Sequence, residues 1–146
     1  MAFVFPLLLA LAVFWQVTHF DFVNYDDDIY IYQNPSIRQG LTLQGLRWAF
    51  CADLCFDSRN ADYWQPVTML SRMIDINLWG LNPRGHHLVN LALHLANVLL
   101  LYFIFLMLPG GDPWRSAWIA AAFAVHPAQA DVVPWVTART DVLSLF

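Results

Sequence analysis

The chain has 146 residues, of which 59% are hydrophobic and only 12% are charged, and its mean hydropathy is +0.48. A water-soluble domain of this length is normally less apolar, so the composition favours a membrane protein. All acidic residues are Asp and all basic residues are Arg, 11 against 7, with a net charge of −4. No cationic surface is therefore available to neutralise the phosphates of a nucleic acid, which argues against nucleic acid as a partner.

Residues 1–20 are predicted to form a first transmembrane helix. Residues 2–17 are an apolar run of 16, a little shorter than the roughly 20 residues that a spanning helix needs. A signal peptide is the alternative, but no basic segment precedes the run and no clear A-x-A cleavage site precedes Asp21. A retained helix is therefore favoured, with a natural N-terminus that lies upstream.

Residues 21–87 are predicted to form a large outer loop, periplasmic or luminal, because they carry eight Asp, five Arg and several turn signals. Two amphipathic helices are expected in it, at 42–55 and 67–79. In the first, Thr42 begins an apolar stripe with helical spacing, which comprises Leu43, Leu46, Phe50 and Leu54. Such helices are typical of a membrane interface.

Cys51 and Cys55 lie four residues apart in this loop. That spacing fits two buried thiols on one helix face, and it also fits a small disulfide in an oxidising compartment. A zinc site would need further Cys or His ligands nearby, and the surrounding sequence has none.

Residues 88–108 are predicted to form a second transmembrane helix, because these 21 residues carry no formal charge. The polar break at 109–115 carries Arg115, so the positive-inside rule places it in the cytoplasm. A third, interrupted helix is expected at 116–125, because a residue before proline is driven out of the helical region and Pro127 follows His126.

The remaining residues are predicted to form an outer loop, 126–141, and the truncated start of a fourth helix, 142–146. Since that last apolar run has no stop signal, the chain is expected to be the N-terminal fragment of a larger multi-span protein.

A stripe of polar residues follows one face of the 88–108 helix, at i, i+3, i+7 and i+10: His87, Asn90, His94 and Asn97. Polar side chains are costly in hydrocarbon, so this stripe is expected to face other helices or an aqueous cavity. Hydrogen bonding between helices and lining of a substrate path are both open from the pattern alone.

Asp26, Asp27 and Asp28 are three adjacent carboxylates directly after the first apolar run. A solvated loop or a helix N-cap would account for them. Mutual repulsion can also raise the pKa of one of them, which is the behaviour of a catalytic base or a metal site. Mg²⁺ or Mn²⁺ would suit such oxygen ligands, with Asp26 and Asp27 as the ligands.

Five blocks occur in the same order as in a known family: "NYDDDIYIYQNP", "LQGLRWAF", "YWQPVTMLSRMID", "LWGLNPRGHHLVNLALHLANVLLL" and "AFAVHPAQADVVPWVTARTDVLSLF". They resemble membrane glycosyltransferases of the GT-C type, most nearly the transmembrane and tetratricopeptide-repeat-containing O-mannosyltransferase-like proteins and their bacterial relatives. The resemblance runs over nearly the whole chain. It implies an all-α integral membrane fold, here the N-terminal part of a GT-C multi-span helical bundle whose large outer loop contains amphipathic interfacial helices.

The resemblance also implies roles for individual residues. In the first outer loop of the family, an Asp-acidic-x-x-Tyr signature is matched by Asp26, Asp27 and Tyr30, and the first carboxylate is the base that activates the acceptor hydroxyl. Asp28 occupies a variable position. The later outer loop of the family is matched by His126-Pro127, Asp131, Trp135, Arg139 and Asp141, with Asp131 standing where relatives usually carry Glu.

The implied reaction transfers a mannose-like hexose from a polyprenyl-phosphate donor to a hydroxyl acceptor, such as protein Ser or Thr. Arg139 is expected to hold the donor phosphate, and His86, His87 or His126 to donate hydrogen bonds to phosphate or sugar. Expected partners are membrane lipid, the lipid-linked sugar and a protein acceptor, in a bacterial inner membrane or an endoplasmic reticulum membrane. A non-enzymatic transporter or scaffold, or an inactive fragment, is the alternative.

Overall fold

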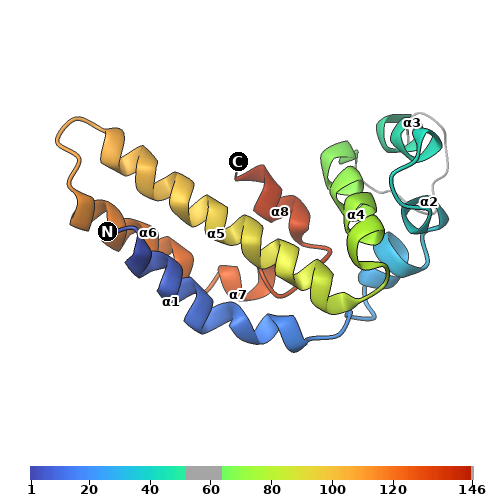
Figure 1. The fold of residues 1–146 in the computed structure, drawn as a ribbon, viewed down its shortest axis with the longest axis horizontal. Coiled ribbons are helices and arrows are strands. Elements are labelled where there is room, and N and C mark those ends of the chain that lie inside the picture. The colour runs from blue at the N-terminus through green and yellow to red at the C-terminus, as the bar shows by residue number, and fades with distance from the viewer. Residues whose placement is uncertain (52–63, 146) are drawn as a thin grey trace. The chain divides into compact units, whose positions relative to one another are not determined.

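The computed structural model describes residues 1–51 and 64–145. All regular secondary structure in this part of the chain is helical (Figure 1), which confirms the all-α class. The elements in chain order are α1 (Val4–Phe14), the 3₁₀ turn η1 (Trp15–His19), the π-type turn η2 (Asp28–Tyr32), α2 (Pro35–Arg38), α3 (Leu43–Cys51), α4 (Pro66–Trp79), α5 (Pro83–Met107), α6 (Pro113–Ala124), α7 (Gln129–Val132) and α8 (Arg139–Ser144).

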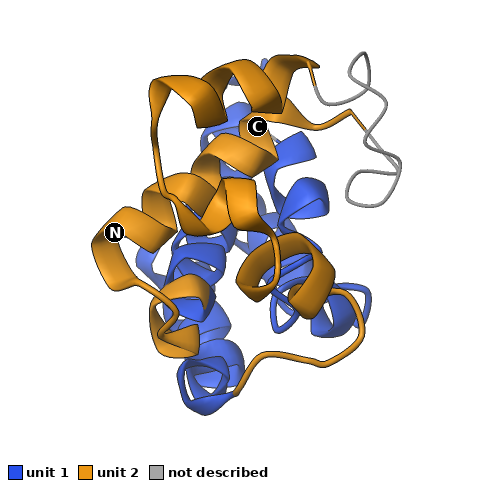
Figure 2. Cartoon of the chain, turned by 90° about the vertical axis from the view of Figure 1, so that its right-hand side faces the viewer, with its two compact units in different colours: residues 1–20, 87–146 blue, residues 21–86 orange. Residues whose placement is uncertain are grey.

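The chain divides into two compact units (Figure 2). Unit 1 comprises residues 1–20 and 87–146, and unit 2 comprises residues 21–86. Unit 2 therefore coincides, but for one residue, with the stretch expected to be an outer loop. This stretch is a folded helical unit with its own core rather than an extended connection.

The core of unit 1 depends on small side chains. Helix α1 packs against α6, and Ala10, Ala117, Ala120 and Ala124 are almost completely buried in one cluster with Val98 of α5. Alanine allows helix backbones to approach closely, which is the packing that membrane helices favour when water provides no driving force.

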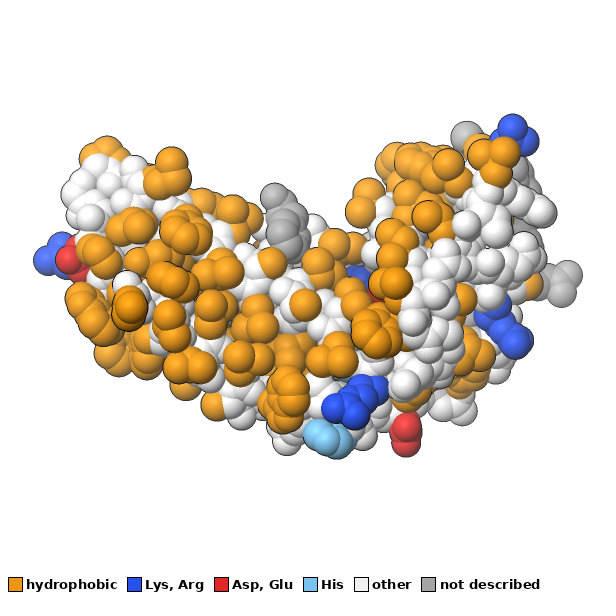
Figure 3. Space-filling view, in the orientation of Figure 1, with side chains coloured by type: hydrophobic (Ala, Val, Ile, Leu, Met, Phe, Trp, Pro, Cys, Tyr) orange, Lys and Arg blue, Asp and Glu red, His pale blue; other side chains and the backbone are white. Residues whose placement is uncertain are grey.

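Helix α5 is the one helix of the described residues that is long and apolar enough to cross a membrane. Its 25 residues span about 37 Å at 1.5 Å per residue. The helix begins five residues before the expected 88–108 segment, because Pro83 suits a first helical position and Asn82 Oδ1 accepts the Arg84 N–H at 3.1 Å. Hydrophobic side chains cover much of the face shown in Figure 3. The exposed hydrophobic residues of α5 include Leu100, Phe103, Ile104 and Met107.

The other two expected spans correspond to shorter helices. Residues Val4–His19 form a continuous apolar helical segment, and α6 has 12 residues. Asp112 caps α6 by accepting the N–H groups of Trp114 and Arg115 at 3.1 and 2.8 Å. The helix ends at Ala124, close to the stop expected from His126-Pro127.

The segment expected to be an outer loop, 126–141, contains more helix than the sequence indicated. It includes the short helix α7 and the beginning of α8, which starts at Arg139 rather than near residue 142. Val133, Val136 and Arg139 are buried. These buried side chains hold the backbone in short helical turns. No hydrophobic periodicity in the sequence indicates such turns.

Unit 2 is built around α4. Helices α2 and α3 pack against it, and the buried apolar side chains include Ile31, Ile37, Ala49, Met69 and Met73. Asn34 caps α2, because its Oδ1 accepts the N–H groups of Ser36 and Ile37 at 3.0 and 3.2 Å. Gly45 brings α3 close to α4, since a Cβ atom there would lie 3.1 Å from the Met73 sulfur.

The two expected amphipathic helices are present as α3 and α4. The end of the first, residues 52–55 with Leu54 and Cys55, lies outside the described residues, as does Phe146 in the expected start of a fourth helix. Cys51 is half-buried at the end of α3. Both interpretations of the cysteine pair therefore stay open.

Candidate functional site

The three adjacent carboxylates occupy a tight turn in unit 2. Asp27 precedes the π-type turn η2 and is completely buried; its Oδ2 accepts the N–H of Val23 at 2.9 Å. Asp26 is only half-buried, and its main-chain carbonyl accepts the Tyr30 N–H at 2.9 Å. The Asp27 carboxylate therefore binds the backbone of its own turn, whereas the Asp26 side chain remains partly accessible.

Asp28 and Tyr32 continue the same turn. Asp28 Oδ1 is buried and has no hydrogen-bond partner among the described residues. The Tyr32 hydroxyl donates to Asn24 Oδ1 at 2.8 Å. Desolvation, together with the negative charges of Asp28 and Asp27, raises the pKa of Tyr32, so its phenol remains a neutral hydrogen-bond donor at physiological pH.

Helix α4 contributes two charged side chains that the sequence analysis did not select. Arg72 and Asp75 are both buried, and the Arg72 guanidinium carbon lies 5.4 Å from the centre of the Tyr30 ring. This distance fits a cation–π contact. The signal in the sequence is a pair of opposite charges at i and i+3, which are the charged residues of this helix.

His86 is fixed inside unit 2 at the beginning of α5. Its Nε2 lies 3.0 Å from the Gly80 carbonyl oxygen and therefore donates to it; its Nδ1 lies 3.3 Å from Asp75 Oδ2. The ring also packs edge-on against Phe22, with centroids 5.3 Å apart. These contacts give His86 a structural function at the junction between α4 and α5.

In unit 1, the polar stripe of α5 binds the C-terminal part of the chain. Asn90 Nδ2 donates to the Trp135 carbonyl at 3.0 Å, and Asn97 Nδ2 donates to the Val142 carbonyl at 2.8 Å. His94 Nε2 lies 3.0 Å from the Ala124 carbonyl oxygen. For these three residues the structure supports hydrogen bonding between packed segments, one of the two interpretations that the pattern left open.

Arg139 is completely buried in the same unit. Its Nε donates to Asn90 Oδ1 at 2.7 Å, a short charge-assisted hydrogen bond. The first residue of α8 is thereby tied to the N-terminal part of α5. Sequence spacing selected both residues but did not indicate that they pair.

The other predicted site residues of unit 1 are distributed differently. His87 is buried, with its ring edge-on to Phe20 at a centroid distance of 6.2 Å. His126 is exposed, and its Nδ1 accepts the Ala128 N–H at 3.2 Å. Asp131 and Asp141 are exposed in the first turns of α7 and α8, where carboxylates interact favourably with the helix dipole.

The structure thus brings the predicted residues together in two groups. Asp26, Asp27, Asp28, Tyr30 and His86 belong to unit 2, whereas Arg139 belongs to unit 1 with Trp135 and the remaining site residues. A meeting of Asp26 and Arg139 across one cavity stays a prediction. Within the described residues, no group of three or more His, Cys, Asp or Glu side chains is placed to hold a metal ion.

No family model and no solved structure matches the chain. The chain is 32% identical over 124 residues to "Protein O-mannosyl-transferase TMTC1" of Mus musculus, covering 81% of this chain and 13% of the relative. It is 32% identical over 139 residues to "Protein O-mannosyl-transferase Tmtc1" of Drosophila melanogaster, covering 93% and 16%. It is 31% identical over 140 residues to "Protein O-mannosyl-transferase TMTC2" of Homo sapiens, covering 94% and 16%.

The helical fold, the apolar α5 and these relatives define a class, that of membrane proteins related to glycosyltransferases. The resemblance found in the five sequence blocks is confirmed: the chain is homologous to a segment of the protein O-mannosyl-transferases TMTC1 to TMTC4. The chain spans 13% to 16% of the length of the three relatives described above.

Proposed function

We propose that the acidic turn of unit 2 (Asp26, Asp27 and Asp28) and Arg139 of unit 1 form part of the active site of a multi-pass membrane glycosyltransferase. The enzyme would move a mannose-like hexose from a polyprenyl-phosphate donor to a protein Ser or Thr hydroxyl on the outer face of the membrane. The observation that carries this proposal is homology, over 81% to 94% of the chain, to proteins named as O-mannosyl-transferases. The membrane setting is supported by α5.

Asp26 is the proposed general base. It is the first carboxylate of the acidic turn, and its partial exposure allows an acceptor hydroxyl to approach it. Asp26 would take the hydroxyl proton while the acceptor oxygen forms a bond to the anomeric carbon. The bond from that carbon to the phosphate oxygen would break, and the phosphate would leave with the electron pair.

Asp27 and Asp28 would support that base. Asp27 is committed through Oδ2 to the Val23 N–H, so it holds the turn in shape. The Asp28 carboxylate, whose Oδ1 is buried, would add negative charge beside Asp26. Tyr30, which packs under Arg72, would fix the turn against α4.

Arg139 is the proposed phosphate ligand. A guanidinium remains charged at every physiological pH and matches two phosphate oxygens with its planar fork. Because Arg139 is buried, the phosphate would have to enter the polar region beside α5. His126 is exposed on the same C-terminal segment and would donate to phosphate or sugar, whereas the buried His86 and His87 would act through packing.

A metal requirement stays a prediction. A bound Mg²⁺ or Mn²⁺ would offset phosphate charge, with Asp26 and Asp27 as its protein ligands. The donor set fits such an ion poorly, because Asp27 already uses one oxygen for the Val23 N–H and no third acidic or His ligand joins them among the described residues. No step of the proposed reaction is therefore assigned to a metal.

A scaffold function is the second candidate, and one observation favours it. Asn90, His94 and Asn97 make hydrogen bonds to backbone carbonyls of the segment that follows α5, as expected of polar residues that hold helices together. This argues against a substrate path along the stripe. It does not account for the acidic turn of unit 2.

The deciding experiment is a transfer assay with the full-length protein in membranes. Radiolabelled mannose on a polyprenyl phosphate would be supplied with a Ser- and Thr-containing peptide, and label on the peptide would be measured. Transfer by the unmodified protein, abolished in an Asp26→Asn, Asp27→Asn double variant, is expected. Equal transfer by both proteins would contradict an enzymatic function of the turn.

A further inference from the structure

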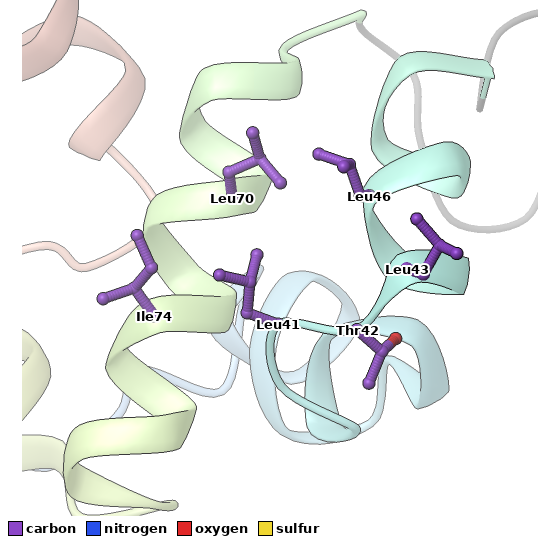
Figure 4. Close-up of a pocket in the computed structure, with 6 residues that line it drawn as sticks. All are labelled: Leu41, Thr42, Leu43, Leu46, Leu70 and Ile74. Atoms are coloured by element: carbon purple, nitrogen blue, oxygen red, sulfur yellow. The ribbon is translucent and has the colours of Figure 1, made fainter.

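An apolar pocket lies between α3 and α4 in unit 2. Its volume is about 430 Å³, and its lining residues are Leu41, Thr42, Leu43, Leu46, Leu70 and Ile74 (Figure 4). Pockets of roughly 300 to 1,000 Å³ are the size that holds small ligands. Leu46 and Leu70 point toward one another across the space between the two helices.

The lining offers almost nothing to a polar ligand. Among the described lining residues, Thr42 is the polar one, and its hydroxyl oxygen accepts the Gly45 N–H at 2.9 Å as the cap of α3. The other described lining side chains are aliphatic. A ligand selected by this pocket is therefore a hydrocarbon chain.

The rim of the pocket is apolar and open. Leu43 is 68% exposed, Leu41 is 48% exposed and Ile74 is 44% exposed. Exposed apolar area costs about 25 cal/mol per Å² in water, and a contiguous exposed patch of this kind usually marks a contact surface. The rim is thus suited to an apolar environment.

The chain itself indicates which environment this is. Helix α4 ends at Trp79, and α5, which is long and apolar enough to cross a membrane, begins at Pro83, so four Cα–Cα steps limit the separation of these ends to about 15 Å. Trp79 and Leu81, both exposed, flank this link, and Trp is enriched at membrane surfaces. A membrane crossing by α5 would therefore place the end of α4 near the surface of the bilayer.

We propose that the pocket between α3 and α4 binds one hydrocarbon chain of a phospholipid from the adjacent leaflet. The lipid chain would replace water against Leu43, Leu46 and Leu70, and it would anchor unit 2 to the bilayer beside the acidic turn. This inference rests on the membrane setting of the proposed function, but it requires no sugar transfer. Lipid binding by the pocket and sugar transfer by the protein can therefore be tested, and can fail, independently of each other.

The test uses the full-length protein in vesicles of defined phospholipid that also contain a polyprenyl phosphate. Leu46→p-benzoylphenylalanine places a photoreactive group in the pocket, and the same replacement at Gln44, which is exposed on α3 outside the pocket, is the matched control. Irradiation should attach phospholipid at position 46 and leave position 44 largely unlabelled. Mass spectrometry of the α3 peptide identifies the adduct.

A second substitution checks that the pocket is responsible. Ile74→Trp fills the rim at an exposed position and should remove most of the phospholipid adduct at position 46, whereas Leu78→Trp, exposed on α4 but outside the pocket, should retain it. An adduct to a peptide or to the polyprenyl phosphate would overturn the proposal. The proposal would also be overturned if the same photoreactive group captured phospholipid at Phe103, which is exposed on α5, but not at position 46.

Discussion

Asn90 and Arg139 lie 49 residues apart in the sequence, and both are completely buried. The amide oxygen of Asn90 accepts a hydrogen bond from Arg139 Nε at 2.7 Å, while its amide nitrogen donates to the Trp135 carbonyl at 3.0 Å. One side chain of α5 thereby satisfies both a donor and an acceptor of the returning segment. An amide is suited to this position because it both accepts and donates.

Replacing Asn90 with Leu should destabilise unit 1. The change leaves a buried guanidinium N–H and a buried carbonyl without this partner, and an unsatisfied buried group costs about 1 to 3 kcal/mol. The expected result is a lower midpoint of thermal unfolding for the detergent-purified full-length protein. Ala92→Leu, at an exposed position of the same helix, is the control and should leave the midpoint nearly unchanged. Equal midpoints for Asn90→Leu and the unmodified protein would show that the pairing contributes nothing.

Asp26 and Asp27 should respond differently to substitution, because the structure assigns them different environments. Asp26→Asn removes the proposed base, and loss of a general base costs about 10²- to 10⁴-fold in rate, whereas donor binding should persist. Asp27→Asn retains an oxygen that can accept the Val23 N–H, so a smaller loss is expected. Transfer rates measured beside donor-lipid affinity separate the two residues. If Asp27→Asn is the more damaging change, the base is assigned to the wrong carboxylate.

Arg139→Lys and Arg139→Ala test the proposed phosphate contact. Alanine removes the cation, whereas lysine retains the charge but loses the planar guanidinium, which donates to Asn90 and would bind the proposed phosphate. Donor affinity should therefore fall in both variants, more strongly in Arg139→Ala, with unfolding midpoints recorded in parallel. Arg115→Ala, which removes an exposed arginine at the beginning of α6, serves as the charge-matched control. A loss of stability with unchanged donor affinity would assign Arg139 to structure alone.

The parts of this fold that the sequence predicts well are those with a strong local signal. An uncharged run predicted α5, a proline predicted the end of α6, and the Leu43-Leu46-Phe50 stripe predicted α3. The short helix α7 and the first turn of α8 escaped prediction because their order depends on contacts such as the hydrogen bond between Asn90 and Arg139, which lie 49 residues apart. Such contacts leave no periodicity in a single sequence.

The candidate site likewise has features that the sequence predicts and features that only the structure shows. The acidic turn is visible in the sequence as a run of three Asp residues. The hydrogen bond from the Val23 N–H to the Asp27 carboxylate could not be predicted from that run. Arg72 and Asp75 were missed because charges on an amphipathic helix usually face water. In this protein both are buried, and only the folded unit shows that Arg72 packs against Tyr30.

The topology prediction concerns the two sides of the membrane. Unit 2 is expected on the outer face and the turn between α5 and α6 in the cytoplasm, because α5, which separates them in the chain, is long and apolar enough to cross a membrane and Arg115 follows the turn. Single cysteines would be introduced as Gln39→Cys and Pro109→Cys, both at exposed positions, in a background with Cys51 and Cys55 replaced by serine. A membrane-impermeant maleimide applied to sealed, outer-face-out membranes should label position 39 and spare position 109 until detergent is added. Labelling of position 109 alone would indicate the opposite orientation, in which the acidic turn and the proposed acceptor lie on the cytoplasmic side.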